Sequence, residues 1–226
     1  MEIVIKNKSK SKKIDASNCV ISLQGVELKD IINNLKETYD CEYISSDDLF
    51  FVGSTVLDEI SIYNKYPEIS FVSNVLVCLG CDTSFFDKSI NALSYSEKII
   101  LNVLRKLSNL NKIVVFDNIF STFDMYFKKK FIKLFELLKE NGYVIFITGD
   151  VNDLYKYSDY SVVSTKSSIK FNSTDDIYTD VAMLKKNKLD IPVLSYITYR
   201  AKEDKGIKLF YSKDIRDIIK DIYKHV

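Results

Sequence analysis

Two runs of consecutive apolar residues stand out in the middle of the chain, Ile113–Phe116 and Tyr143–Ile147. A strand buried on both faces shows such a continuous run, whereas a half-buried strand alternates. The segment between the runs carries apolar residues at helical spacing and ends at Asn141-Gly142, a pair typical of a helix C-terminus. These apolar residues are Phe127, Phe131, Leu134, Phe135 and Leu138. Strand, crossover helix and strand predict a βαβ unit and therefore a parallel sheet.

Weaker patterns predict the other elements. Val20–Leu23 is a short apolar run that indicates a buried strand, and Val162-Val163 indicates another. Helices are predicted after Gly25 and from Ser96, because each segment has apolar residues on one face. The residues on these faces are Ile31, Ile32 and Leu35 in the first and Ile99, Ile100, Val103, Leu104 and Leu107 in the second. Residues 59–93 are mixed, with a helical piece around Ile69–Leu79.

The pattern changes after about Ser164. Polar residues dominate as far as Asp176, and two helical stretches follow at Val181–Leu189 and Asp214–Tyr223. We interpret this part as a small appended unit and not as a continuation of the sheet. The predicted division is therefore 1–164 and 165–226, with a helical subdomain at roughly 58–108 in the first unit.

Composition narrows the class of protein. The 226 residues are 46% hydrophobic and 28% charged, as in an ordinary globular protein, and the formal net charge is +1. Such a balance does not point to nucleic acid as a partner. Lysines 6, 8, 10, 12 and 13 favour a solvated N-terminal hairpin, with a nucleic-acid or lipid contact as the alternative.

No segment reaches the ~18 apolar residues of a membrane span, and no apolar region follows the first lysines as in a secretory signal. We therefore expect a cytosolic chain whose contact with a membrane goes through another subunit. The four cysteines should stay thiols there. Cys78 and Cys81 have CxxC spacing, which admits a redox pair or half a zinc site. Because a second pair is missing and the only histidine is His225, two small core residues around Gly80 are the simpler interpretation.

A series of short motifs follows one order along the chain: Leu93–Lys98, then Ile113–Asn118, Ser121–Asp124 and Ile147–Asp150. In this order and at this spacing they resemble the LSGGE/Q signature, Walker B strand, D-loop and switch-histidine loop of ATP-binding-cassette (ABC) ATPases. Ser54–Ile60 and the tail from Leu184 to Tyr223 are similar to segments of the energy-coupling-factor subfamily. The resemblance covers nearly the whole chain. It implies an α/β P-loop NTPase-like cassette, with a mixed sheet, a helical subdomain and a small helical C-terminal extension.

The segment at the Walker A position is Leu23–Asp30. A Walker A loop needs glycines so that backbone N–H groups can curl around phosphates at a helix N-terminus. Gly25 and Lys29 remain, but Leu28 replaces the glycine before the lysine, and Asp30 replaces the hydroxyl that should ligate Mg²⁺. Glu27 and Asp30 add negative charge where phosphates should sit. An alternative is that Lys29 is an ordinary surface lysine.

The predicted catalytic positions also depart from the family pattern. Asp117 ends its strand as the Mg²⁺-holding Walker B aspartate would, although an Asp at a strand end is also common loop chemistry. The next residue, which should be a glutamate that polarises the attacking water, is Asn118, and an amide cannot take a proton. The switch histidine falls on Gly149, and the Q-loop glutamine falls on Ser46. The resemblance implies ATP and Mg²⁺ as cofactors, bound weakly or not at all by this chain alone. Because Walker A, the catalytic glutamate and the switch histidine are missing, it leaves open whether the chain is an enzyme.

Cassettes of this family pair head to tail, so each nucleotide lies between the Walker A of one chain and the signature of the other. Ser94 in the signature and Asp124 in the D-loop are kept, and Ser94 could serve the nucleotide site of a competent partner. Tyr95 and Ser96 replace the two signature glycines, and the chain has only 6 glycines in all. The alternative is that Ser94 only caps the following helix, with Glu97 completing a capping box.

Four functions remain open. The first is a cassette subunit of a micronutrient importer, for vitamins or metal ions, with lost or impaired hydrolysis. It would work at the cytoplasmic face of the membrane with a second cassette, as a heterodimer, and with a membrane-embedded coupling subunit. The second is a non-catalytic scaffold or regulator. The others are a nucleic-acid-associated ABC ATPase and an active ATPase, which would need a Walker A elsewhere; no GxxxxGK[ST] segment is present.

Overall fold

The computed structural model describes residues 1–8, 10–109 and 111–224; His225 lies outside the described residues. In this part of the chain the central sheet has six strands in the order β4-β5-β6-β3-β7-β8. Their bounds are β3 Cys19–Gly25, β4 Cys41–Ser45, β5 Ile113–Asp117, β6 Val144–Ile147, β7 Tyr160–Ser164 and β8 Ile169–Ser173. All neighbouring strands are parallel except the antiparallel pair β7 and β8. The predicted parallel sheet and its βαβ unit, β5-α5-β6, are confirmed.

The strand β8 corrects one expectation. The sequence predicts no continuation of the sheet after Ser164, yet β8 pairs with β7 over five residues, from Tyr160↔Ser173 to Ser164↔Ile169. An edge strand needs only one buried face, and in β8 only Ile169 is fully buried, so its pattern is too polar to be recognised. The division at residue 164 itself remains a prediction.

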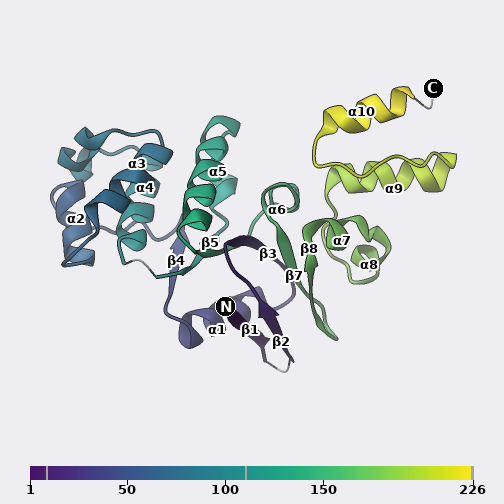
Figure 1. Cartoon of the computed structure of the whole chain (residues 1–226), viewed down its shortest axis with the longest axis horizontal. Coiled ribbons are helices and arrows are strands. Elements are labelled where there is room, and N and C mark those ends of the chain that lie inside the picture. The colour runs from purple at the N-terminus through teal and green to yellow at the C-terminus, as the bar shows by residue number, and fades with distance from the viewer. Residues whose placement is uncertain (9, 110, 225–226) are drawn as a thin grey trace.

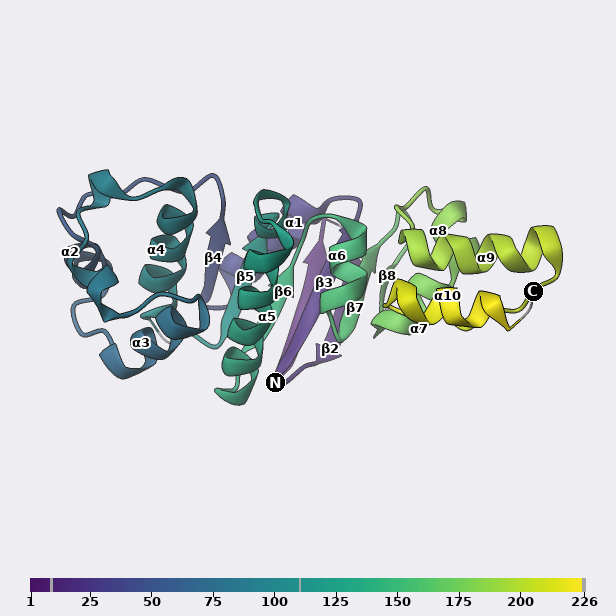
Figure 2. The same ribbon diagram turned by 90° about the horizontal axis from the view of Figure 1, so that it is seen from above.

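Some helices pack near the sheet, and two further groups of helices lie beyond its two edge strands (Figures 1 and 2). Near the sheet lie α1 Leu28–Thr38, α5 Met125–Glu140 and α6 Val151–Tyr157. Beyond β4 lie α2 Val56–Tyr63, α3 Ile69–Cys78 and α4 Tyr95–Leu107, with the short 3-10 turns η1 Thr83–Asp87 and η2 Ile90–Ala92; η3 Ile119–Thr122 follows β5. At the other end lie α7 Thr174–Thr179, α8 Val181–Lys186, α9 Val193–Lys205 and α10 Ile215–Tyr223. The helix α9 has no counterpart in the sequence prediction.

The N-terminal residues form the expected hairpin. Strand β1 (Glu2–Asn7) pairs antiparallel with β2 (Lys10–Asp15). Ile3 and Ile5 of β1 and Ile14 of β2 are fully buried against the sheet, while most of the lysines stay exposed. The hairpin therefore covers one face of the sheet beside α1 and leaves its charges in water (Figure 1).

Two apolar clusters lie on opposite faces of the sheet. Along β5, Val114 and Phe116 belong to the larger cluster, which also contains the inner faces of α3, α4, α5 and α6. Ile113 and Val115 belong to the smaller cluster beneath α1 and the hairpin. This alternation explains why β5 is apolar at every position: both of its faces are covered. Ligands of such parallel sheets bind outside the carboxyl ends of the strands.

Candidate functional site

The connection between β3 and α1, where the family binds phosphate, is a tight turn. Strand β3 ends at Gly25 and α1 begins at Leu28, so only Val26 and Glu27 lie between them. The N–H of Val26 donates a hydrogen bond to the Ser164 carbonyl oxygen, 2.9 Å away, and is therefore turned toward β7. Glu27 has a left-handed backbone, φ 60°, and caps the helix without a side-chain hydrogen bond. The Val26 N–H is thus not available to a phosphate, whereas a Walker A loop directs a run of consecutive N–H groups at its ligand.

Gly25 is required by this turn for a steric reason. Its φ is +119°, a conformation that L side chains rarely adopt, and an added Cβ would lie 1.9 Å from the Ser164 carbonyl oxygen. The glycine therefore allows β3 and β7 to approach each other. The sequence predicts Gly25 as a remnant of a phosphate loop, and the structure gives it this packing role.

The charged residues of the turn lie at the surface. Lys29 is exposed, and Asp30 is half-buried at an ion-pair distance of 3.7 Å from Lys8 of the hairpin. An exposed pair of this kind contributes little to stability. The turn between β3 and α1 thus brings together Gly25, Lys29 and Asp30. Asp30 places a carboxylate where the family has the hydroxyl that ligates Mg²⁺.

A second group of predicted residues meets at the carboxyl ends of β5 and β6. Both carboxylate oxygens of Asp117 accept hydrogen bonds: Oδ2 from the Tyr43 hydroxyl at 2.5 Å and Oδ1 from the Thr148 hydroxyl. The Thr148 oxygen in turn accepts the N–H of Asn118 at 3.0 Å. A Cβ on Gly149 would lie 3.3 Å from the Asn118 side-chain oxygen. The structure therefore brings Asp117, Asn118 and Gly149 together, with two hydroxyl residues that sequence reasoning missed.

The missed residues have recognisable positions. Tyr43 lies two residues before the end of β4, and Thr148 directly follows β6. Parallel neighbours bring these positions to the same edge as Asp117. The sequence predicts no strand at Cys41–Ser45, so the contact of Tyr43 with Asp117 is not expected from it. Burial first, and then the hydrogen bond to Asp117, raise the pKa of Tyr43 to about 12. Its hydroxyl is therefore protonated and donates at neutral pH.

The signature position lies at the start of α4. Ser94 is the N-cap of this helix and exchanges hydrogen bonds with Glu97 in a capping box. Lys88 donates to the Glu97 carboxylate at 2.6 Å, and this bond and those from Ser94 lower the pKa of Glu97 to about 2. The Tyr95 hydroxyl donates to the buried Ser46 carbonyl oxygen at 3.4 Å. Ser94 thus has the capping role that the sequence admits, and it remains exposed.

Asp124 has a similar local role. It is the N-cap of α5, and its Oδ1 accepts the N–H of Phe127 at 2.7 Å. An N-cap of this kind satisfies a backbone donor that the helix leaves unpaired. The side chains of Ser94 and Asp124 therefore cap the N-termini of α4 and α5. In contrast, the hydrogen bonds of Asp117 connect residues at the ends of strands.

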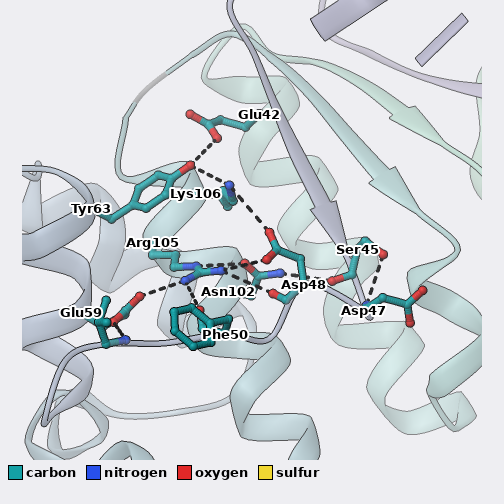
Figure 3. Close-up of polar contacts among 11 residues, drawn as sticks. Glu42, Ser45, Asp47, Asp48, Phe50, Glu59, Tyr63, Asn102, Arg105 and Lys106 are labelled. Atoms are coloured by element: carbon teal, nitrogen blue, oxygen red, sulfur yellow. Dashed lines mark hydrogen bonds and ion pairs between the residues drawn. The ribbon is translucent and has the colours of Figure 1, made fainter. Parts of the chain in front are cut away.

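A buried polar network fixes the loop after β4 (Figure 3). Arg105 of α4 is 7% exposed and lies 2.8 Å from the carboxylate of Glu59 of α2, which is 2% exposed. Arg105 also donates to the Phe50 carbonyl oxygen at 2.7 Å, and Glu59 accepts the N–H groups of Val52 at 2.9 Å and Gly53 at 2.8 Å. Burial raises the pKa of Glu59, but the hydrogen bonds from Gly53, Val52 and Arg105 outweigh it, so the pKa is lowered.

The same network reaches the end of β4. The Asn102 side chain donates to the Ser45 carbonyl oxygen at 3.2 Å and accepts from Arg105 Nε at 3.1 Å. Asp48 lies within ion-pair distance of Arg105, 3.6 Å, and of Lys106, 3.9 Å. Residues 45–53 are thus held between β4 and the helices α2 and α4 (Figure 3).

Cys78 and Cys81 lie at the end of α3 and just beyond it, partly buried against the larger cluster. Burial raises the pKa of both thiols. Within the described residues no group of three or more His, Cys, Asp or Glu side chains could hold a metal ion. In the same residues no helix has the length and apolar character needed to traverse a bilayer.

Sequence comparisons relate the chain to ATP-binding proteins of transporters. No family model matches the chain. The energy-coupling factor transporter ATP-binding protein EcfA1 of Lactobacillus gasseri is 30% identical over 170 residues, which are 70% of this chain and 58% of that protein. An ABC transporter ATP-binding protein of Bacillus thuringiensis is 30% identical over 130 residues, 55% of this chain and 23% of its own length. The chain thus spans about three fifths or less of these curated relatives.

Solved structures show the same fold. CbiO1 from Clostridium perfringens, part of the ABC transporter complex cbiONQ, has a TM-score of 0.63 over 85% of this chain and 92% of its own, at 16% identity. An inward-facing metal-chelate type ABC transporter has a TM-score of 0.60 over 77% of this chain and 79% of its own, also at 16% identity.

The fold is that of ATP-binding-cassette proteins. Within that class, the chain is related in sequence to the ATP-binding subunits of energy-coupling-factor transporters. The predicted family and fold class are therefore confirmed.

Proposed function

We propose that the chain is a cassette subunit of an energy-coupling-factor type importer for micronutrients, at the cytoplasmic face of the membrane. Its relative in Lactobacillus gasseri is named as the ATP-binding protein of such a transporter, and CbiO1 is described as part of an ABC transporter complex. In this proposal the chain pairs with a second cassette and docks on a membrane-embedded coupling subunit.

We also propose that this chain does not hydrolyse ATP by itself. The observation that carries this proposal is the two-residue connection between β3 and α1, which offers no cradle of N–H groups for phosphates. Glu27 and Asp30 add repulsion at the same turn. At the other end of the site Asn118 cannot accept a proton from water, and Gly149 has no side chain to contribute.

An asymmetric pair is compatible with this arrangement. A competent partner would supply Walker A, Walker B and the catalytic glutamate, and this chain would lend the exposed Ser94 and Asp124. Tyr95 is 51% exposed and stands beside Ser94, where the family has a glycine. The ring therefore limits how closely a partner's nucleotide can approach, and the shared site should be weak.

A calorimetric titration of the isolated chain with Mg-ATP tests the loss of nucleotide binding. We expect no binding in the micromolar range, and the same result for Lys29→Ala. Micromolar binding that Lys29→Ala abolishes would contradict the proposal.

The importer role is tested separately by co-expression with an intact cassette and a membrane coupling subunit. Co-purification of the three chains supports it. A chain that stays alone in this experiment favours a non-catalytic scaffold or regulator instead.

A further inference from the structure

The Tyr43–Asp117–Thr148 cluster occupies the position at which an ABC protein would hold its metal ion. A metal-binding carboxylate needs a lone pair directed at the ion or at a water of its first shell. Here each oxygen of Asp117 already accepts a hydrogen bond from a hydroxyl group, Oδ2 from Tyr43 and Oδ1 from Thr148. One lone pair remains on each oxygen, so a Mg²⁺ ion or its water would have to compete with the two hydroxyls for the orientation of the carboxylate.

The two hydroxyls are not free to turn away. The ring of Tyr43 packs against the smaller apolar cluster, and the Lys36 ammonium of α1 lies 4.6 Å from its centroid. The hydroxyl oxygen of Thr148 is fixed from its other side by the N–H of Asn118. A cation at Asp117 would have to compete with two positioned donors, whose bonds to the carboxylate are charge-assisted and stronger than bonds between neutral groups.

We propose that the hydroxyls of Tyr43 and Thr148 replace the metal ion at Asp117. The carboxylate then joins the carboxyl ends of β4, β5 and β6 as a structural group. The inference deepens the proposed loss of hydrolysis and rests on it, because a working cassette needs this carboxylate for its metal. It identifies Tyr43 as the residue that closes the metal position.

A double-mutant cycle between Tyr43→Phe and Asp117→Leu tests the stabilising hydrogen bond between these two side chains. Leu resembles Asp in shape but accepts no hydrogen bond. Tyr43→Phe alone should raise the unfolding equilibrium constant by about ten-fold, since a hydroxyl bond to a charged group is lost. In the Asp117→Leu background the same change should have little effect. Tyr126→Phe, at a ring that is 70% exposed, is the matched control and should leave stability unchanged.

Thr148 gives an independent arm of the test. Thr148→Val removes the hydroxyl and should destabilise the chain, whereas Thr148→Ser keeps the hydroxyl and should restore most of the stability. An equal effect of Tyr43→Phe with and without Asp117→Leu overturns the inference. A Thr148→Ser variant as unstable as Thr148→Val overturns it as well.

A titration with Mn²⁺ alone, followed by electron paramagnetic resonance, completes the experiment. We expect the wild type and Asp117→Leu to bind the same amount of Mn²⁺, because Asp117 holds no metal ion. Mn²⁺ binding that depends on Asp117 overturns the inference. Because no nucleotide or partner is present, this outcome is separate from the Mg-ATP titration and from co-purification, which test the proposed function.

Discussion

At the scale of single residues, the buried pair of Arg105 and Glu59 is unusual because burying two charges is costly. Removing them from water costs several kcal/mol per ion, and only good geometry and further hydrogen bonds offset this cost. Both requirements are met: the pair is 2.8 Å apart, and each partner bonds backbone groups of residues 50–53. The charges therefore order the backbone of a loop whose Leu49 and Phe51 side chains also pack against the larger apolar cluster.

Replacing Arg105 with Met should be severely destabilising. Glu59 would remain buried with its charge unpaired, so we expect a loss of about 3–5 kcal/mol in the free energy of unfolding, measured by urea denaturation. The double variant Arg105→Met/Glu59→Leu should recover much of this loss, because no buried charge remains. A double variant no more stable than the single one would mean that the backbone hydrogen bonds dominate.

Gly25 allows a second prediction at this scale. Gly25→Ala places a Cβ against the Ser164 carbonyl oxygen, so we expect a cost of about 3 kcal/mol from the forced shift of β7. Gly206→Ala is the matched control: φ is +66° there, and nothing lies within 4 Å of the added Cβ. That change should cost only about 1 kcal/mol. Equal midpoints of thermal unfolding for the two variants would refute the packing role of Gly25.

At the scale of elements, the start of α4 should make stability depend on pH. The pKa of Glu97 is lowered from 4.5 to about 2, first by Lys88 and then by Ser94. A lowered folded-state pKa contributes stability that is present above pH 4.5 and is lost as the pH falls toward 2. Glu97→Gln keeps a capping side chain without the charge. Its midpoint of unfolding should fall less steeply between pH 5 and pH 2 than that of the wild type, and identical slopes would contradict this assignment.

The sequence could predict those elements whose pattern reflects burial. β5, β6 and α5 are apolar where they are most buried, and α4 is so except at Asn102 and Arg105, so periodicity finds all four. β8 and α9 could not be found in this way, because the first is a polar edge strand and only Ser195 and Thr198 of the second are fully buried. At the site, strand ends predict that Asp117 lies near Gly149. The partners of Asp117 depend on side-chain direction across three strands, which spacing along the chain does not give.

At the scale of the whole molecule, the C-terminal part lies beyond β7 and β8 at one end of the sheet (Figure 2), and its two portions contribute unequally to the core. The C-terminal part carries four residues of the larger apolar cluster, Ile177, Tyr178, Met183 and Leu184. The Tyr178 hydroxyl also lies 3.4 Å from that of Ser22 in β3. A unit that is separate in sequence character is thus joined to the cassette core. In contrast, the apolar residues buried beyond Gly206, within the described part, are Leu209 and Ile218.

This contrast predicts different results for two truncations of the chain. Ending it after Ser164 removes β8 and the four cluster residues, which at ~1.5–3 kcal/mol each is comparable with the whole stability of a domain. We therefore expect residues 1–164 to show no cooperative thermal unfolding by circular dichroism. A chain of residues 1–206 lacks only α10 and the segment 207–214 before it. It should unfold cooperatively, with a slightly lower midpoint of thermal unfolding. Cooperative unfolding of residues 1–164 would instead establish them as an independent domain, with the extension as an accessory to its core.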